Sequence, residues 1–129
     1  MTGVPLLSSP PEVVRRMLKV AEVGPRDLVY DLGCGDGRIL IAAVEDFEAK
    51  EAIGYETRED VYEKALEEVA KAHLQDRIRV INRDFFEADL SRATVITLYL
   101  DSSTNEKLRV KLEKETSPGT RIVSHDSPI

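Results

Sequence analysis

The sequence predicts an α/β fold built on a doubly wound parallel sheet. Five short apolar segments alternate along the 129 residues with longer segments whose apolar residues recur at helical spacing. The first apolar segment runs directly into a loop with glycine at every second position, and an amphipathic helix follows that loop at once. Strands that alternate with helices form a parallel sheet wound right-handedly, with ligand sites at the carboxyl ends of the strands.

The first helix is expected to begin within residues 9–12, which read Ser-Pro-Pro-Glu. Ser9 is a favoured N-cap residue, proline suits the first turn, and Glu12 completes a capping box. The apolar residues that follow form one stripe at helical spacing, made of Val13, Val14, Met17, Leu18 and Ala21. Gly24-Pro25 is expected to stop this helix, and the first strand then spans about residues 28–32.

The second helix, second strand and third helix follow in turn. The second helix is expected from Arg38 to near Phe47, and its buried residues are Ile39, Leu40, Ala43 and Phe47. The second strand is predicted at residues 52–56. Thr57 is expected to open the third helix, whose buried face carries Val61, Ala65, Val69 and Ala72. The acidic outer face of that helix indicates a solvated surface, with docking of a basic protein as the alternative.

The remaining elements complete the alternation. The third strand is predicted near residues 78–81, and the fourth at residues 94–100, where β-branched residues are frequent. A helix containing Leu108 and Leu112 comes next, followed by a Ser-Pro-Gly turn at residues 117–119. The fifth strand is predicted at residues 121–124.

The loop after the first strand is the most informative segment, and it runs from Asp31 to Gly37. Its alternating glycines remove the Cβ atoms that would hold a ligand away from the backbone. The helix behind it aims free N–H groups at the same space. A dinucleotide fingerprint would need glycine or alanine where Arg38 stands, so an NAD-dependent enzyme is a distant alternative. A phosphate-binding P-loop would need Gly-Lys followed by Ser or Thr, which the chain lacks.

The pattern Asp-x-Gly-x-Gly-x-Gly resembles motif I of the seven-β-strand, or class I, S-adenosylmethionine-dependent methyltransferases. The resemblance implies the Rossmann-like fold of that class and S-adenosyl-L-methionine as the cofactor. Asp31 would meet the cofactor's ammonium directly or through water, while backbone N–H groups near Gly35 and Gly37 would meet its carboxylate. The segment that includes Gly33 and Cys34 would leave room for the sulfonium and ribose, with Cys34 as a small space-filling residue rather than a nucleophile.

Acidic residues also close the second and third predicted strands. Glu56, 19 residues beyond Gly37, can accept both ribose hydroxyls in a bidentate pair. Asp84 resembles the family's acceptor for the adenine amino group, and Phe85 could lie against the ring. Each residue alone also fits a structural role, as a capping acid, a solvated strand end or a core aromatic. Their order at the ends of three successive strands favours the cofactor site.

Further segments are similar to the archaeal broad-specificity protein-lysine methyltransferases, relatives of the eukaryotic mitochondrial lysine methyltransferases. These segments are residues 10–18, 29–38, 97–100 with Asn105, and 118–126. The resemblance implies lysines on small basic chromatin proteins, among others, as substrates. Two departures stand out: residues 5–9 lack the tyrosine often found there in relatives, and the C-terminal hairpin that helps to wall the acceptor site is missing.

The residues after the fourth strand favour an aliphatic amine as the methyl acceptor. Methyltransferases of planar nitrogens usually carry an Asn- or Asp-Pro-Pro-aromatic motif there, whereas residues 98–101 read Leu-Tyr-Leu-Asp. An apolar channel would lower the pKa of a lysine acceptor, and in-line positioning would accelerate the transfer. Leu98, which we also assign to the cofactor site, and its neighbours would line this channel. Tyr99 would orient the amine, with a packed structural role as its open alternative. Asp101 or Asp126 would accept the proton or attract the lysine cation.

Composition bounds the remaining possibilities. The length fits a single domain spanning residues 1–129. No apolar run approaches a membrane span and no secretion signal is evident, so we expect a cytoplasmic protein. The net charge of −6 argues against direct binding to nucleic acid. One cysteine and no Cys/His cluster predict neither a metal site nor an internal disulfide. Abundant Glu, Lys and Arg beside few Gln, Asn, Cys and Met indicate a thermophilic source.

The position of Ile129 raises one structural question. Class I methyltransferases normally add a sixth strand and an antiparallel seventh, but this sequence ends just after the fifth. Truncation is favoured over a hairpin absent by nature, because the fifth strand would otherwise keep an unpaired edge open to self-association. Two other functions stay open: methylation of a small molecule or RNA, and a non-catalytic module that binds S-adenosylmethionine.

Overall fold

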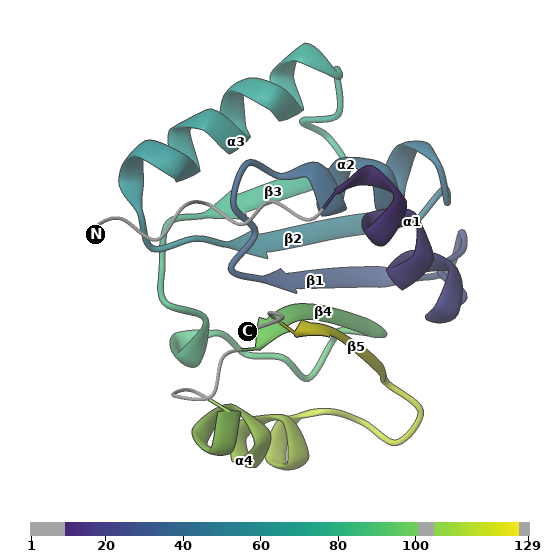
Figure 1. Cartoon of the computed structure of the whole chain (residues 1–129), viewed down its shortest axis with the longest axis vertical. Helices are drawn as coiled ribbons and strands as arrows, with labels where there is room; N and C mark the ends of the chain where they lie inside the picture. Colours follow the sequence, from purple (N-terminus) through teal and green to yellow (C-terminus); the bar gives the residue numbers. More distant parts are fainter. Residues whose placement is uncertain (1–9, 101–104, 127–129) are drawn as a thin grey trace.

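Residues 10–100 and 105–126 are described by the structure, a computed structural model of the chain. Five parallel strands form one sheet in the order β3-β2-β1-β4-β5. Their bounds are β1 Leu28–Leu32, β2 Glu51–Tyr55, β3 Ile78–Ile81, β4 Val95–Leu100 and β5 Arg121–Asp126. All the strand arrows point the same way, so their carboxyl ends share one edge of the sheet (Figure 1). The predicted doubly wound parallel sheet is confirmed.

The helices cover both faces of this sheet. They are α1 Pro11–Val20, α2 Arg38–Glu45, α3 Glu59–Lys71 and α4 Asn105–Glu115, with a 3₁₀ turn, η1, at Phe85–Glu87. Apolar residues of α1, α2 and α3 share one core cluster with β1 to β4. Residues of α4 and of the segment around η1 form the second cluster, on the opposite face. In Figure 1 the sheet runs from β3, next to α3, down to β5, with α4 beyond it.

Alternation along β1 and β4 puts two polar side chains on the sheet face that α1, α2 and α3 cover. Val29 packs in the α2 cluster, whereas Tyr30 belongs to the α4 cluster. Because successive strand residues face opposite sides, Asp31 returns to the α2 side. The same alternation in β4 puts Thr97 on that side, and Asp31 and Thr97 are partners in the parallel register. Two buried polar residues therefore meet within an otherwise apolar layer.

Helix α1 begins at Pro11, within the predicted residues 9–12, but its N-cap residue and its last residue differ from the prediction. Ser9 lies outside the described residues, and the N-cap is Pro10, whose carbonyl accepts the N–H groups of Val13 and Val14 at 3.0 Å. Among the described residues no side chain caps this end, and Pro11 has no N–H that would need a partner. The helix also ends at Val20, before Gly24. Glu22 takes a left-handed φ of 55° there, and its N–H bonds back to the Lys19 carbonyl at 3.0 Å.

Thr57 does not begin α3, because tertiary hydrogen bonds hold this residue outside the helix. The Asn82 side-chain amide donates to the carbonyl oxygens of Glu56 and Thr57 at 2.8 and 3.2 Å. The chain consequently stays extended past β2, and α3 starts at Glu59 with Arg58 as its N-cap. The predicted apolar face of α3 is otherwise confirmed for Val61, Ala65 and Val69, which are buried.

Gly54 marks the closest approach of the sheet to the glycine-rich loop. A Cβ atom at this position would lie 2.6 Å from the Cys34 Cβ and Sγ atoms and from Leu40 Cδ1. All three atoms belong to side chains that are buried in the core and cannot move away without disturbing their neighbours. Because residue 54 has no side chain, the glycine-rich loop and the start of α2 can pack closely against β2.

We expect Gly54→Ala to lower the free energy of unfolding by about 1–3 kcal/mol through overpacking. Urea denaturation measures the difference. Gly24→Ala is the matched control, because a Cβ there would meet no atom within 4 Å and should leave the midpoint nearly unchanged. Equal midpoints for the two variants would contradict the close packing of the loop on β2.

Candidate functional site

The glycine-rich loop folds back onto the carboxyl end of β2. Gly33, Gly35 and Gly37 have φ values of 83°, 57° and 88°, in the left-handed region that favours glycine. The N–H groups of Gly33 and Cys34 both donate to the Tyr55 carbonyl at 2.9 Å. A Cβ at Gly33 or Gly35 would meet no atom within 4 Å, so the loop borders open space. The backbone is thus exposed to a ligand, as the sequence predicts for this segment.

Glu56 joins this loop to the start of α3. Its Oε1 atom accepts the Gly35 N–H at 2.9 Å, and its Oε2 atom accepts the Arg58 N–H at 3.1 Å. The residue is 9% exposed. Each carboxylate oxygen keeps a further lone pair, so the group can still accept two hydroxyl donors. The structure brings Glu56 to the loop as predicted and adds a backbone-holding role that sequence reasoning missed.

Asp31 is buried at the end of β1, beside Thr97. The Thr97 hydroxyl donates to Asp31 Oδ1 at 2.9 Å. Burial raises the pKa of Asp31 to about 7; the Thr97 hydrogen bond opposes this rise and the nearby Glu56 charge adds to it. A buried carboxylate with this pKa favours a cationic partner, such as an ammonium group. Thr97 was not among the predicted site residues, although the strand register pairs it with Asp31.

Asp84 and Phe85 follow β3 and belong to a separate group. Asp84 Oδ1 accepts the Phe86 N–H at 2.9 Å and so caps η1. The Phe85 and Phe86 rings lie 4.8 Å apart, and the Lys107 ammonium lies 4.7 Å from the Phe86 centroid. This arrangement joins η1 to α4. Asp84 is exposed and its described hydrogen bond uses Oδ1, so the carboxylate can still accept a donor from a ligand.

The residues assigned to the acceptor channel are described only in part. Leu98 is 3% exposed and packs in the α4 cluster, on the sheet face opposite Asp31. The backbone of Tyr99 pairs with that of His125 in β5. The side chains of Tyr99 and Asp126 lie outside the described residues, and so does the whole of Asp101.

Cys34 sits in the middle of the loop but is unsuited to nucleophilic chemistry. It is 5% exposed, and burial raises the pKa of its thiol far above the ordinary value, with the Asp31 and Glu56 charges adding to the rise. The thiol therefore stays protonated and fills space, as predicted. Within residues 10–100 and 105–126, no cluster of three His, Cys, Asp or Glu residues could hold a metal ion. The described helices are all too short or too polar to cross a membrane.

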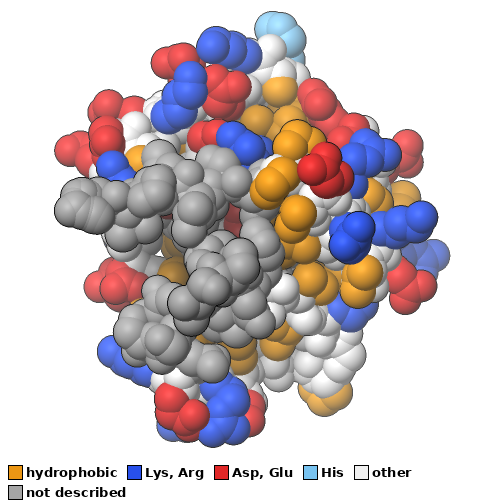
Figure 2. Space-filling view, in the orientation of Figure 1, with side chains coloured by type: hydrophobic (Ala, Val, Ile, Leu, Met, Phe, Trp, Pro, Cys, Tyr) orange, Lys and Arg blue, Asp and Glu red, His pale blue; other side chains and the backbone are white. Residues whose placement is uncertain are grey.

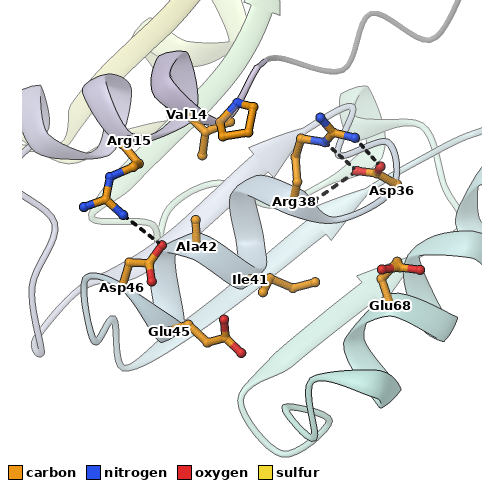
Figure 3. A pocket seen from close by; sticks show the side chains of 10 residues that line it. Val14, Arg15, Asp36, Arg38, Ile41, Ala42, Glu45, Asp46 and Glu68 are labelled. Carbon is orange, nitrogen blue, oxygen red and sulfur yellow. Dashed lines mark hydrogen bonds and ion pairs between the residues drawn. The ribbon is translucent and has the colours of Figure 1, made fainter.

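A cavity of about 380 Å³ lies on the outer side of α2, between α1 and α3 (Figure 3). Ile41 and Ala42 of α2 line it, and the Arg15–Asp46 ion pair lies at its α1 side. Its other lining residues are Pro11, Val14, Asp36, Arg38, Glu45 and Glu68. Asp31, Gly33, Gly35 and Glu56 are not among them, so this cavity is distinct from the hydrogen-bonded cluster at the strand ends.

Asp36 and Arg38 connect this cavity to the glycine-rich loop. Asp36 accepts hydrogen bonds from Arg38 Nε at 3.1 Å and Nη2 at 2.8 Å, in a bidentate pair. Hydrogen bonding to the guanidinium lowers the pKa of Asp36. The pair lies next to Gly37, the N-cap of α2, and fixes the exit of the loop into the helix.

This chain is similar to known methyltransferases in sequence and in fold. The family described as ANTKMT methyltransferase domain matches residues 31–129. A protein-lysine N-methyltransferase of Saccharolobus islandicus is 48% identical over 98% of this chain and 78% of its own length. The mouse adenine nucleotide translocase lysine N-methyltransferase is 28% identical over 98% of this chain and 54% of its own length. A crystal structure of an RNA methyltransferase from Salinibacter ruber, in complex with S-adenosyl-L-homocysteine, has a TM-score of 0.90 and 46% identity, over 93% of this chain and 78% of that one.

Proposed function

This chain belongs to the ANTKMT methyltransferase domain family, and on that premise we propose that it transfers a methyl group from S-adenosyl-L-methionine to lysine side chains of proteins. The observation that carries the proposal is the cluster at the ends of β1 and β2. There Glu56 holds the side-chain-free loop through the Gly35 N–H, and buried Asp31 lies beneath it. This arrangement offers carboxylates for an ammonium and open backbone for a carboxylate.

The residues fit S-adenosyl-L-methionine in a specific order. In this proposal Asp31 meets the ammonium, the loop from Gly33 to Gly37 (with Cys34) meets the carboxylate and sulfonium, and Glu56 accepts the ribose hydroxyls. Asp84 and Phe85 take the adenine, while Leu98 supports the site from the core of β4. When bound, the cofactor supplies a methyl group on a positively charged sulfur.

Transfer requires a neutral lysine amine. A bond forms between its nitrogen and the methyl carbon, the sulfur–methyl bond breaks, and the nitrogen loses a proton. We assign Tyr99 to orient this amine, and Asp101 to attract the lysine cation or accept its proton. An apolar channel would favour the neutral amine, because burial penalises the ammonium form.

The choice of acceptor rests on two observations. The lysine-specific relative is similar over almost the whole chain, and a second relative that acts on lysine shares the same span. The net charge is −6, and on the face shown in Figure 2 Lys and Arg side chains are interspersed with Asp and Glu rather than gathered in a basic field. We therefore propose basic, lysine-bearing proteins as substrates, in the cytoplasm. RNA is the second candidate, because the Salinibacter ruber protein is named an RNA methyltransferase.

Methyl transfer from isotope-labelled S-adenosylmethionine tests this function. With a basic protein pool and total RNA supplied together, we expect label in material that protease destroys and nuclease leaves intact. Gly33→Arg should abolish transfer, because its side chain would enter the open space at the loop. Gly119→Arg is the matched control: this glycine also has a positive φ and open surroundings, but it precedes β5 at the other edge.

Each alternative predicts a different result, and calorimetry of cofactor binding is needed beside the labelling for one of them. Label in material that nuclease destroys would identify RNA, and not protein lysine, as the methyl acceptor. Calorimetric binding of S-adenosylmethionine without transfer to either pool would instead indicate a non-catalytic module.

A further inference from the structure

Thr97 is the polar side chain most deeply buried in the described part of the sheet, and the proposed function gives it no role. It is 0% exposed and lies in β4 between two apolar neighbours, Ile96 and Leu98. Its hydroxyl is 2.9 Å from Asp31 Oδ1 and 3.5 Å from the Tyr30 carbonyl oxygen. The shorter contact identifies the Asp31 carboxylate as the preferred acceptor. A hydroxyl that is fully buried is normally hydrogen-bonded to a specific partner.

Few other groups act on the Asp31 carboxylate in the described structure. Glu56, after β2, faces it with a like charge that disfavours ionisation. Cys34, in the loop above, contributes a thiol that remains protonated and so adds no charge. From β4, Thr97 contributes the one neutral donor. Burial and the like charge therefore both oppose the ionised form of Asp31, and the Thr97 hydrogen bond alone among these supports it.

We propose that Thr97 is a positioning residue for methyl-donor binding, whose hydroxyl favours the ionised form of the Asp31 carboxylate and orients it toward the ammonium of S-adenosylmethionine. This inference rests on the proposed function and adds to it a residue that determines the pH range of cofactor binding. A hydroxyl suits this role because it can rotate. It donates a hydrogen bond to the carboxylate when Asp31 is charged. When Asp31 is neutral, the hydroxyl can turn to donate to the Tyr30 carbonyl and accept a hydrogen bond from the carboxyl O–H of Asp31.

Removal of the hydroxyl should move the titration of Asp31 to higher pH. Thr97→Val keeps the side-chain shape but leaves Asp31 Oδ1 without its donor, and hydrogen bonds to charged groups are among the stronger ones in proteins. We expect the Asp31 midpoint to rise by about one pH unit. The ionised fraction at pH 7 would then fall from about one half to about one eleventh, which corresponds to about a fivefold loss of cofactor affinity at that pH. Thr97→Ser restores the hydroxyl and should restore both properties.

Two measurements on the full chain test this role. Carbon-13 NMR of labelled aspartate follows the Asp31 carboxyl from pH 5 to pH 9 without ligand, with Asp31→Asn assigning its signal. Calorimetry with S-adenosyl-L-homocysteine over the same pH range gives the affinity. We expect native and Thr97→Ser proteins to share a midpoint near 7, and Thr97→Val to titrate higher and to bind more weakly at pH 7 than at pH 9. Thr97→Ala removes the same hydroxyl with less bulk and serves as a second variant.

The outcomes separate this inference from the function on which it rests. An unchanged Asp31 midpoint in Thr97→Val and Thr97→Ala, with ligand binding intact, would overturn the role of Thr97 alone. A loss of affinity that is equal at every pH in both variants would also overturn this role, because a purely structural defect weakens binding without changing its pH dependence. A native protein that binds no S-adenosyl-L-homocysteine at any pH would overturn the proposed function together with this inference.

Discussion

The Asp31→Asn variant is expected to be more stable than the native protein at pH 8 while losing most of its affinity for S-adenosylmethionine. Burial raises the pKa of Asp31 from 3.8 to about 7, so the folded protein disfavours the ionised carboxylate. A tenfold change in a proton equilibrium corresponds to about 1.4 kcal/mol, and the rise therefore represents a cost on the order of 4 kcal/mol above pH 7. Asparagine is close in shape to aspartate and carries no charge, so the variant avoids this cost.

The raised pKa of Asp31 lowers the stability of the native protein only over a defined pH range. Between about pH 4 and pH 7 the folded state keeps a proton on Asp31 that the unfolded state has released, so the native free energy of unfolding falls as pH rises. Below this window both states are protonated and the variant gains nothing. Urea denaturation at pH 4, 6 and 8 should show the stability advantage of Asp31→Asn growing with pH. An advantage that is equal at all three values would mean that ionisation is not its source.

Asp36→Asn is the matched control in the same loop, with the opposite sign. The Arg38 guanidinium lowers the pKa of Asp36, so its carboxylate stabilises the folded protein above the ordinary pKa and loses this effect as pH falls. We expect Asp36→Asn to be less stable than the native protein at pH 8, with the difference shrinking in acid. The ionised Asp36 thus favours folding, whereas the ionised Asp31 at the other end of the same loop opposes it. The cost at Asp31 has a function if the ammonium of a bound ligand supplies the missing countercharge.

The sequence was sufficient for the sheet, the glycine-rich loop and the position of Glu56. Apolar periodicity and punctuation by glycine and proline locate the five strands within a residue or two. The largest difference is at the end of β5, which extends two residues further than predicted, to Asp126. Glu56 could be predicted because parallel strands deliver their carboxyl ends to one edge. Its hydrogen bond to the Gly35 N–H could not, because it depends on how the loop folds back in space.

Thr97 shows why part of the site escapes sequence reasoning. A threonine within a strand rich in β-branched residues is ordinary, and only the register of β1 against β4 pairs it with Asp31. The start of α3 was misplaced for a related reason. Asn82, 25 residues after Thr57, holds that residue outside the helix. Local propensity predicts elements well, but contacts between distant segments decide their ends and their polar partners.

The second large effect concerns the opposite edge of the sheet, where Asp27 joins four segments of the chain. Its carboxylate accepts the Gly24 N–H and the Thr94 hydroxyl, both at 2.8 Å, and forms an ion pair with Arg121. The Thr94 hydroxyl oxygen in turn accepts the Leu28 N–H at 2.8 Å. The Arg121 guanidinium also donates to the Ala21 carbonyl at 2.8 Å. The end of α1 and the starts of β1, β4 and β5 thus meet at one carboxylate that is 6% exposed.

Asp27→Ala should therefore lower the free energy of unfolding by about 2–4 kcal/mol, because it leaves three donors without their acceptor, one of them a guanidinium. The lower part of this range reflects Arg121, whose side chain is 38% exposed and can turn to water. Asp60→Ala is the control: its ion pair with Arg58 is long, at 3.5 Å, and exposed, so its loss should leave the urea midpoint unchanged. Cofactor affinity below the melting range should be the same in Asp27→Ala and native proteins, since Asp27 lies at the amino ends of the strands and the candidate site at their carboxyl ends. A variant as stable as the native protein would show that α1 and β5 are held by apolar packing alone.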